Sequence, residues 1–257
     1  MKKPINNRSL ERALHILGAF STKDRKLSLP QLSANLDLPK STVYRLCVTL
    51  INNDFLKYDE QAGQYSLGLK LFHLGAIVSA SFSVSQSASP HLAILQKKTS
   101  KTILLGVLQD GNLMYLDKRE DVTSPIRFNS EIGMLRQPYF GMLGQTLLAY
   151  LPAKEVAGLI NKRPLKPVTE RSIKTKKELT KRLALIRRRG FVFEEEEVID
   201  GVGGIAAPIF NQNREVVAAV GLRFILSADG RRKKEKMIKQ VCETARAIST
   251  DLGLEAL

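Results

Sequence analysis

Three short segments with helical spacing of apolar residues occupy the first 53 positions of the chain, and polar breaks separate them. They span residues 9–20, 28–36 and about 40–53. The first helix is predicted to begin at Ser9, a plausible N-cap, and to bury a stripe that includes Leu10, Leu14 and Leu17. Two short helices that lead through a tight turn into a third helix are typical of a helix-turn-helix motif.

The next segment changes from helical spacing to β-prone residues. Residues 55–58 and 65–67 flank a polar turn that contains Gly63, which predicts a β-hairpin and hence the wing of a winged helix-turn-helix domain. Helical spacing then returns, and a broad apolar stripe extends from Leu69 to Val78. We expect a linker helix here, with a stripe wide enough to pack on a second copy of itself.

Helical and β-prone segments are mixed in the rest of the chain. Helices are predicted over residues 84–98, 144–150, 154–161, 176–189 and 233–251. Strands are predicted over residues 103–108, 113–117, 126–128, 191–193, 204–210 and 216–224. The sequence therefore predicts an α+β protein with a winged helix-turn-helix domain over 1–68, a linker helix over 69–83, and a domain over 84–257 in which helices pack on a central antiparallel sheet.

Net charge adds a candidate partner to this picture. The formal charge is +15, and excess positive charge favours polyanions such as nucleic acid. Residues 162–189 alone hold 12 basic side chains against Glu170 and Glu178. No apolar run is long enough to span a bilayer, and two cysteines are too few for a disulfide framework. A cytoplasmic protein without a membrane partner is expected.

The exposed face of the third helix has the composition of a DNA-binding surface. Val43, Cys47 and Leu50 mark its buried side. The opposite face is formed by Ser41, Arg45, Val48, Thr49 and Asn52, with Thr42 and Tyr44 at its edges. Arginine can bond guanine O6 and N7 together, and hydroxyl groups reach phosphates or base edges. We predict that Arg45, near the middle of this face, contacts base edges.

Several segments, in matching order, resemble one family over essentially the whole chain. Residues 38–46, together with 9–17 before them and 65–68 after them, are similar to the DNA-binding domain of the IclR family of bacterial transcription regulators. In the second half, 144–149 resembles the family's Gly-Lys-Ala-Leu-Leu-Ala segment. Residues 189–197 and 201–209 resemble its Arg-Gly-Tyr…Asp-x-Glu-Glu and Gly-x-x-Cys-Ile-Ala-Ala-Pro-Val stretch.

The resemblance implies a sequence-specific transcription regulator, and not an enzyme, with no cofactor and no metal. Its winged-helix domain would bind operator DNA as a dimer or a dimer of dimers, and a GAF-like effector domain would bind a small organic acid. The implied DNA-binding residues are Lys40, Ser41, Thr42, Tyr44 and Arg45, and the exposed face of the third helix adds Thr49. The implied effector-binding residues are Met142, Leu143, Glu194, Val202, Gly204, Gly221 and Arg223. We expect the operator to be an inverted repeat with half-sites about one helical turn apart.

Departures from the family pattern fall in the implied effector pocket. Tyr139 stands where the family often has histidine, Gln145 replaces a common lysine, and Gly204 replaces a common cysteine. The last inner strand has Gly221 and Arg223 in place of the two serines of Ser-x-Ser. These changes argue against transferring any particular effector from the family to this chain.

Arg223 suggests the chemical class of the effector. It alternates with Leu222 and Phe224 on its predicted strand and therefore faces away from both. An arginine among apolar walls is costly unless an anion pairs with it. We expect Glu194 to pair with it in the free protein, and a carboxylate larger than a two- or three-carbon acid to replace Glu194. Gly204 and Gly221 would leave the room for such a ligand.

Two further interpretations of the sequence remain open. The basic stretch 162–189 could form a second nucleic-acid surface, which would make the chain a nucleic-acid-binding module without an effector. Alternatively, the chain could be a metabolite-sensing scaffold that does not bind DNA. Signals for an enzyme are weak, because the three histidines are isolated and the acidic run 194–197 is expected to form a solvated edge with one pocket carboxylate.

Overall fold

The computed structural model describes residues 7–21, 23–81, 83–121, 127–162, 164–227 and 233–254. Contacts divide the chain into two compact units, Met1–Ser81 and Phe82–Leu257. No helix in the described ranges combines the length and the apolar character needed to cross a bilayer.

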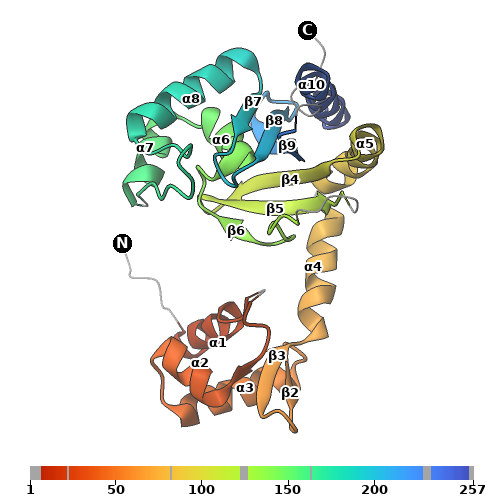
Figure 1. The fold of residues 1–257 in the computed structure, drawn as a ribbon. Coiled ribbons are helices and arrows are strands. Elements are labelled where there is room, and N and C mark those ends of the chain that lie inside the picture. The colour runs from red at the N-terminus through yellow and green to blue at the C-terminus, as the bar shows by residue number, and fades with distance from the viewer. Residues whose placement is uncertain are drawn as a thin grey trace. The chain divides into compact units, whose positions relative to one another are not determined.

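The first unit is a winged helix-turn-helix domain followed by a helix (Figure 1). Its elements are α1 (Arg8–Gly18), β1 (Leu27–Ser28), α2 (Leu29–Leu36), α3 (Lys40–Asn52), β2 (Leu56–Asp59), β3 (Gln64–Leu67) and α4 (Leu69–Ser81). Ile16, Leu32, Val43 and Cys47 are completely buried between the first three helices. The helix-turn-helix, the hairpin and the helix that follows are confirmed in the order predicted from the sequence.

Helix α1 departs from the prediction at its start and in its buried face. It begins at Arg8 because the side chain of Asn7, and not that of Ser9, accepts hydrogen bonds from the first free N–H groups. Leu10 and Leu14, expected in the core, are 59% and 57% exposed, and Ile16 is buried instead. Leu17 and Ala13, which also belong to the expected stripe, do pack against this core, so the prediction is wrong only at Leu10 and Leu14.

The second unit contains one six-stranded antiparallel sheet, as predicted, with strand order β6-β5-β4-β9-β8-β7. Its helices are α5 (Ser83–Thr99), α6 (Gly141–Ala149), α7 (Ala153–Lys162), α8 (Lys176–Arg189) and α10 (Lys234–Asp251). Its strands are β4 (Thr102–Gln109), β5 (Asn112–Arg119), β6 (Leu135–Arg136), β7 (Val192–Glu195), β8 (Val202–Phe210) and β9 (Val216–Ile225).

Each face of this sheet has its own apolar core. On one face, residues such as Val220 and Leu222 of β9 pack with α5 and α10. On the other face, Ala219 of β9 and Ala206 of β8 pack with α6, α7 and α8 (Figure 1). Because side chains alternate along a strand, Arg223 shares the second face with Ala219, under α6 and α8.

One predicted strand is wrong. The expected strand over 126–128 begins outside the described residues, and Arg127 and Phe128 are not in a strand. Phe128 is nevertheless 4% exposed, because its ring packs into the domain from an irregular segment held by Lys118 Nζ donating to its carbonyl at 2.9 Å. Residues 135–136 form the outer strand β6 instead, paired to β5 at Leu113 and Met114.

Candidate DNA-binding and effector sites

Helix α3 presents the side chains predicted to bind DNA on its outer surface. Lys40, Ser41, Tyr44, Arg45 and Thr49 are exposed, whereas Thr42 is half-buried. The opposite side is fixed in the core by three buried residues, Val43, Cys47 and Leu50. The sequence 40–52 contains no acidic side chain, so nothing on this helix repels a phosphate.

The turn before α3 is held by its own hydrogen bonds. Asp37 adopts a left-handed conformation with φ of 51°, and its N–H donates to the carbonyl of Ala34. The Ser33 hydroxyl donates to the carbonyl of Leu38 at 2.5 Å. The start of α3 is therefore rigidly placed relative to α2. Near the other end of α3, the Thr49 hydroxyl donates to the Arg45 carbonyl at 3.1 Å. Because its hydrogen is engaged in this bond, the Thr49 hydroxyl can accept a hydrogen bond from DNA but cannot donate one.

Strand pairing in the second unit aligns the charged candidates of the effector site. Glu194 pairs with Gly204, and Gly204 pairs with Arg223, so the three residues form one row across β7, β8 and β9 on the same face of the sheet. Glu194 is 4% exposed and Arg223 is 5% exposed. Two opposite charges are thus buried on either side of a residue that has no side chain.

The start of α6 covers this row. Gly141 has φ of +63°, and a methyl group there would lie 3.3 Å from Arg223 Nη2 and 3.7 Å from Glu194 Oε1. A side chain at position 141 would therefore be both strained and crowded by the two charged groups. The next residue, Met142, donates its backbone N–H to Glu194. The N-terminus of α6 and the row on the sheet consequently form one site.

The space expected beside Gly204 and Gly221 is filled in this structure. A methyl group at Gly204 would lie 2.8 Å from Met142 Sδ, and one at Gly221 would lie 3.1 Å from Met142 Cε. The thioether shares this volume with Glu194 Oε1, 2.7 Å from a methyl group at Gly204, and with the Ile205 carbonyl oxygen, 2.5 Å from one at Gly221. A cavity of about 30 Å³ adjoins Gly141 and Gln145, which is about the volume of one water molecule.

Glu194 and Arg223 do not form the expected ion pair. Glu194 Oε2 and Arg223 Nε have no hydrogen-bond partner among the described residues. Arg223 lies instead against the ring of Phe128, with Cζ 5.5 Å from the ring centroid. Burial raises the pKa of Glu194 to about 7, and the nearby Glu197 carboxylate also raises it, although Arg223, Arg182 and the Met142 N–H oppose this shift.

A second buried carboxylate lies next to this site and was not foreseen. Glu197 is 7% exposed, because Glu196 takes a left-handed conformation with φ of 59° and the chain turns back inward after β7. Glu197 accepts from Arg182 Nη2 at 2.6 Å and from Gln145 Nε2 at 2.8 Å. Arg182 Nη1 also donates to Gln145 Oε1 at 3.2 Å. This closed network, the Gln145–Arg182–Glu197 triad, joins α6, α8 and the β7–β8 loop.

The remaining effector-site candidates lie at different distances from the charged row. Val202 is buried on the same face of β8 as Gly204, two residues away. Leu143 is also buried, but it points toward Gly106 of β4, where a methyl group would lie 3.2 Å from its Cδ1. Leu143 therefore belongs to the core under α6 rather than to the charged row. The described residues contain no group of His, Cys, Asp or Glu side chains suited to a metal ion.

Much of the charge in the basic stretch 162–189 is engaged within the domain. Arg182 belongs to the triad, Arg171 pairs with Glu196 at 3.1 Å, and Lys174 pairs with Glu170 at 3.2 Å. Arg187 donates to the carbonyls of Ala149 and Leu151. A DNA phosphate would therefore have to displace these contacts within the domain before it could pair with the same cations.

Family models match both units. The IclR helix-turn-helix domain matches residues 9–60, and the C-terminal domain of the bacterial transcriptional regulator IclR matches residues 77–250. Among solved structures, the IclR transcriptional regulator from Alicyclobacillus acidocaldarius has a TM-score of 0.85 and 26% identity, covering 96% of this chain and 100% of that chain. IclR of Thermotoga maritima has a TM-score of 0.75 and 28% identity, covering 96% and 99%.

Curated relatives align over nearly the full length. The transcriptional repressor AllR of Klebsiella pneumoniae is 30% identical, covering 96% of this chain and 90% of its own. The transcriptional regulator XynR of Escherichia coli is 29% identical, covering 96% and 98%. The chain therefore belongs to the IclR family of bacterial transcription regulators, which are not enzymes and which bind DNA through the helix-turn-helix domain and an effector through the C-terminal domain.

Proposed function

We propose that a small organic acid, bound at Arg223, controls how this regulator binds its operator. The observation that supports the proposal is a buried guanidinium aligned across Gly204 with a buried carboxyl group, whose Nε and Oε2 have no partner in the part of the chain that the structure describes. A ligand carboxylate offers two acceptor oxygens, which suits the fork of an arginine. The buried charge of Arg223 would then gain the anion that it lacks.

Met142 is the element that would admit such a ligand. Its thioether fills part of the volume over Gly204 and Gly221, and methionine is unbranched and adapts its rotamer readily. Rotation of Met142 would open a space bounded by these two glycines, Glu194 and Arg223. The proposed effector is a carboxylate larger than a two- or three-carbon acid, because glycines stand where the family has cysteine and serine side chains and so leave more space for the ligand. Since Met142 starts α6, ligand entry would also shift this helix.

Thermal-shift screening of small carboxylates, followed by calorimetric titration of the best one, tests this proposal. Arg223→Gln should weaken binding by about 100-fold, the loss of a charge-assisted pair. Arg119→Gln is the control, because Arg119 lies on the same sheet but is only half-buried and pairs with Asp117 at 3.0 Å. Unchanged affinity in Arg223→Gln would contradict the effector site, whereas unchanged operator binding in both variants is expected.

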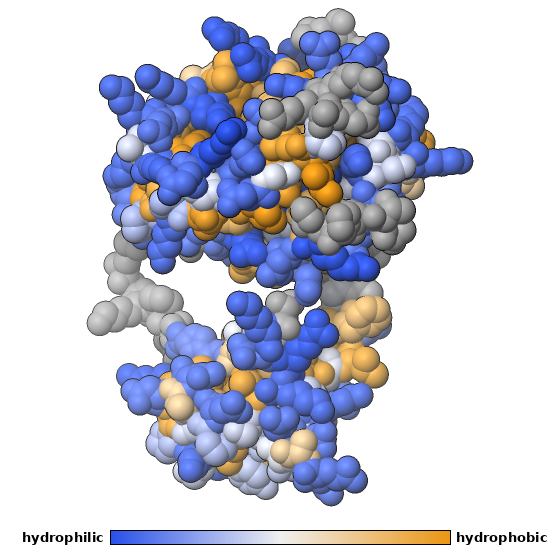
Figure 2. All heavy atoms as spheres, in the orientation of Figure 1, coloured by the Kyte–Doolittle hydropathy of each residue, from blue (hydrophilic) through white to orange (hydrophobic). Residues whose placement is uncertain are grey.

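We also propose that the protein binds an inverted repeat as a dimer or a dimer of dimers. Helix α4 exposes Leu69, Phe72 and Ile77, which are 67%, 77% and 53% exposed. Figure 2 shows hydrophobic side chains at the surface over the first part of α4. A second copy would bury them and would place two α3 helices on one operator. Light scattering of wild type and Phe72→Ser tests this: a wild-type monomer that still binds the operator would contradict it.

A further inference from the structure

A second cavity, of about 240 Å³, opens at the surface between α7 and α8. Its buried lining consists of Val156 and Ile160 from α7 and Leu183 from α8. None of the ten residues that line it belongs to the row of Glu194, Gly204 and Arg223. The cavity is therefore distinct from the proposed effector site.

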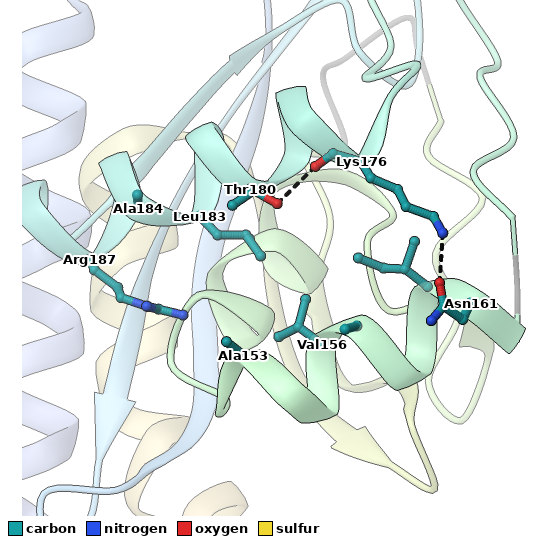
Figure 3. A pocket seen from close by; sticks show the side chains of 10 residues that line it. Ala153, Val156, Asn161, Lys176, Thr180, Leu183, Ala184 and Arg187 are labelled. Atoms are coloured by element: carbon teal, nitrogen blue, oxygen red, sulfur yellow. Dashed lines mark hydrogen bonds between the residues drawn. The ribbon is translucent and has the colours of Figure 1, made fainter.

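Polar bridges lie at the two ends of this cavity, and Figure 3 shows the one between Lys176 and Asn161. At one end, Lys176 Nζ of α8 donates to Asn161 Oδ1 of α7 at 2.6 Å. At the other end, Arg187 donates to the carbonyls of Ala149 and Leu151, which precede α7. Between the bridges, the lining contains Ala153, Ala157 and Ala184, whose side chains are too small to fill the gap. We call this space the α7–α8 pocket.

The α7–α8 pocket combines an apolar wall with positive charge. Among the described residues, no acidic side chain lines it, and the charged lining residues are Lys176 and Arg187. Arg187 already donates through Nε and Nη2 to two carbonyl oxygens. The Lys176 ammonium has three N–H donors and uses one in the hydrogen bond to Asn161, so two remain for a ligand. It also stands in the first turn of α8, where the helix dipole favours an anion.

We propose that the α7–α8 pocket binds an organic monoanion with an apolar body, whose carboxylate meets Lys176 and whose body covers Val156 and Leu183. The bridges at both ends close the pocket to a continuous peptide or nucleic-acid strand, which would have to pass through them. The volume lies somewhat below the ~300 Å³ at which small-molecule sites commonly begin, so the body should be small, roughly eight carbons. Straight-chain or singly aromatic monocarboxylates meet these requirements.

Calorimetric titration of the full-length protein with octanoate tests the proposal. Ala184→Leu places a larger side chain in the pocket while keeping a strong helix former on an exposed position. It should weaken octanoate binding by about tenfold or more and leave the unfolding temperature unchanged or higher. Lys176→Gln should also weaken binding by about tenfold, because it removes the charge. Octan-1-ol, which lacks the charge, should bind the wild type more weakly than octanoate does.

Two control variants separate this pocket from its surroundings. Lys181→Gln removes an exposed cation from the same helix but outside the lining, and Arg223→Gln disables the proposed effector site. Lys181→Gln should bind octanoate like the wild type, and Arg223→Gln should keep the octanoate site that Ala184→Leu weakens. The proposal is overturned if octanoate does not bind at about 5 mM, if Ala184→Leu binds it unchanged, or if Arg223→Gln abolishes binding. Ala157→Leu replaces Ala184→Leu if the latter does not fold.

Discussion

The DNA-binding surface and the proposed effector site of this protein use polar groups in opposite ways. The candidate DNA contacts, Lys40 to Thr49, lie within one helix and are mostly exposed. The effector-site charges Glu194 and Arg223 lie on two strands and are almost completely buried. In the first case water solvates the charges until DNA replaces it. In the second case the fold itself must stabilise each charge, through a partner, a proton or a ligand.

This difference means that the same kind of substitution has different consequences in the two units. Removing an exposed arginine from α3 leaves no unpaired charge behind, so the loss should appear in DNA binding and not in stability. Removing Arg182 from the second unit leaves the buried Glu197 without its counter-charge, so the loss should appear in stability first. The predictions below test this contrast, in order of decreasing expected effect.

The largest effect is expected for Arg182→Met, which breaks the Gln145–Arg182–Glu197 triad. Glu197 is 7% exposed and would lose the 2.6 Å contact from Arg182. The free energy of unfolding should fall by about 3 kcal/mol, the lower end for a broken buried pair because the Arg182 side chain is 25% exposed. Denaturant titration of the purified variant measures this change.

Two further variants distinguish a lost pair from lost packing. The double variant Arg182→Met, Glu197→Gln should recover about half of the lost stability, because the unpaired charge is then absent. Lys181→Met, on the exposed side of the same helix, should change stability by less than about 0.5 kcal/mol. Equal losses for Arg182→Met and Lys181→Met would show that the triad contributes nothing specific.

Elements with clear local signals could be predicted from the sequence, whereas very short strands and the packing of a helix could not. Helix α8 was predicted with its observed bounds, and Thr175 and Glu178 form a capping box at its start while Gly190 ends it in a left-handed conformation. The two-residue strand β1 was missed because such a segment has no period. The exposure of Leu10 and Leu14 depends on how α1 packs, which helical spacing alone does not determine.

For the sites, local geometry was predictable and long-range contacts were not. The inward direction of Arg223 follows from strand alternation. The filling of the pocket by Met142 and the contact of Gln145 with Glu197 depend on how α6 packs on the sheet. The inward turn at Glu196, which buries Glu197, follows from a single left-handed residue that is not glycine. No composition rule identifies that position.

The next largest effect concerns Glu194 and pH. Its folded-state pKa, raised to about 7, lies above its unfolded value, so its contribution is fully present below about pH 4.5 and is lost as pH rises to about 7. Glu194→Gln cannot ionise. The unfolding free energy of the variant minus that of the wild type should therefore increase between pH 4 and 8, by up to about 3 kcal/mol.

The same variant tests the link to the effector. A carboxylate ligand adds a negative charge beside Glu194, so wild-type affinity should fall as pH rises above about 7, and this fall should disappear in Glu194→Gln. If the wild type instead became more stable relative to the variant as pH rises, Glu194 would be a stably ionised partner of Arg223. The proposal that Arg223 lacks an anion until the ligand binds would then be wrong.

In the first unit, Arg45→Ala should weaken operator binding by about 1–3 kcal/mol and relax specificity at one position of each half-site. Stability should be unchanged, because Arg45 is exposed on α3. Fluorescence anisotropy on the operator and on random DNA measures both effects. Lys57→Ala, on the exposed strand of the wing, is the control and should weaken binding to the operator and to random DNA equally. Equal weakening in Arg45→Ala would make Arg45 a phosphate contact.

The smallest effect is expected for the outer face of α8, where the triple variant Lys177→Gln, Lys181→Gln, Arg188→Gln removes three exposed cations. Other cations of this stretch, such as Arg171, Arg182 and Arg187, are engaged within the domain. Operator affinity should change by less than about twofold, and its dependence on salt should stay the same. If these residues bound phosphates, each one lost would reduce the slope of log affinity against log salt by about 0.9. A clear reduction would therefore make the basic stretch a second DNA-binding surface, and the contrast between an exposed DNA-binding unit and a buried effector site would no longer hold.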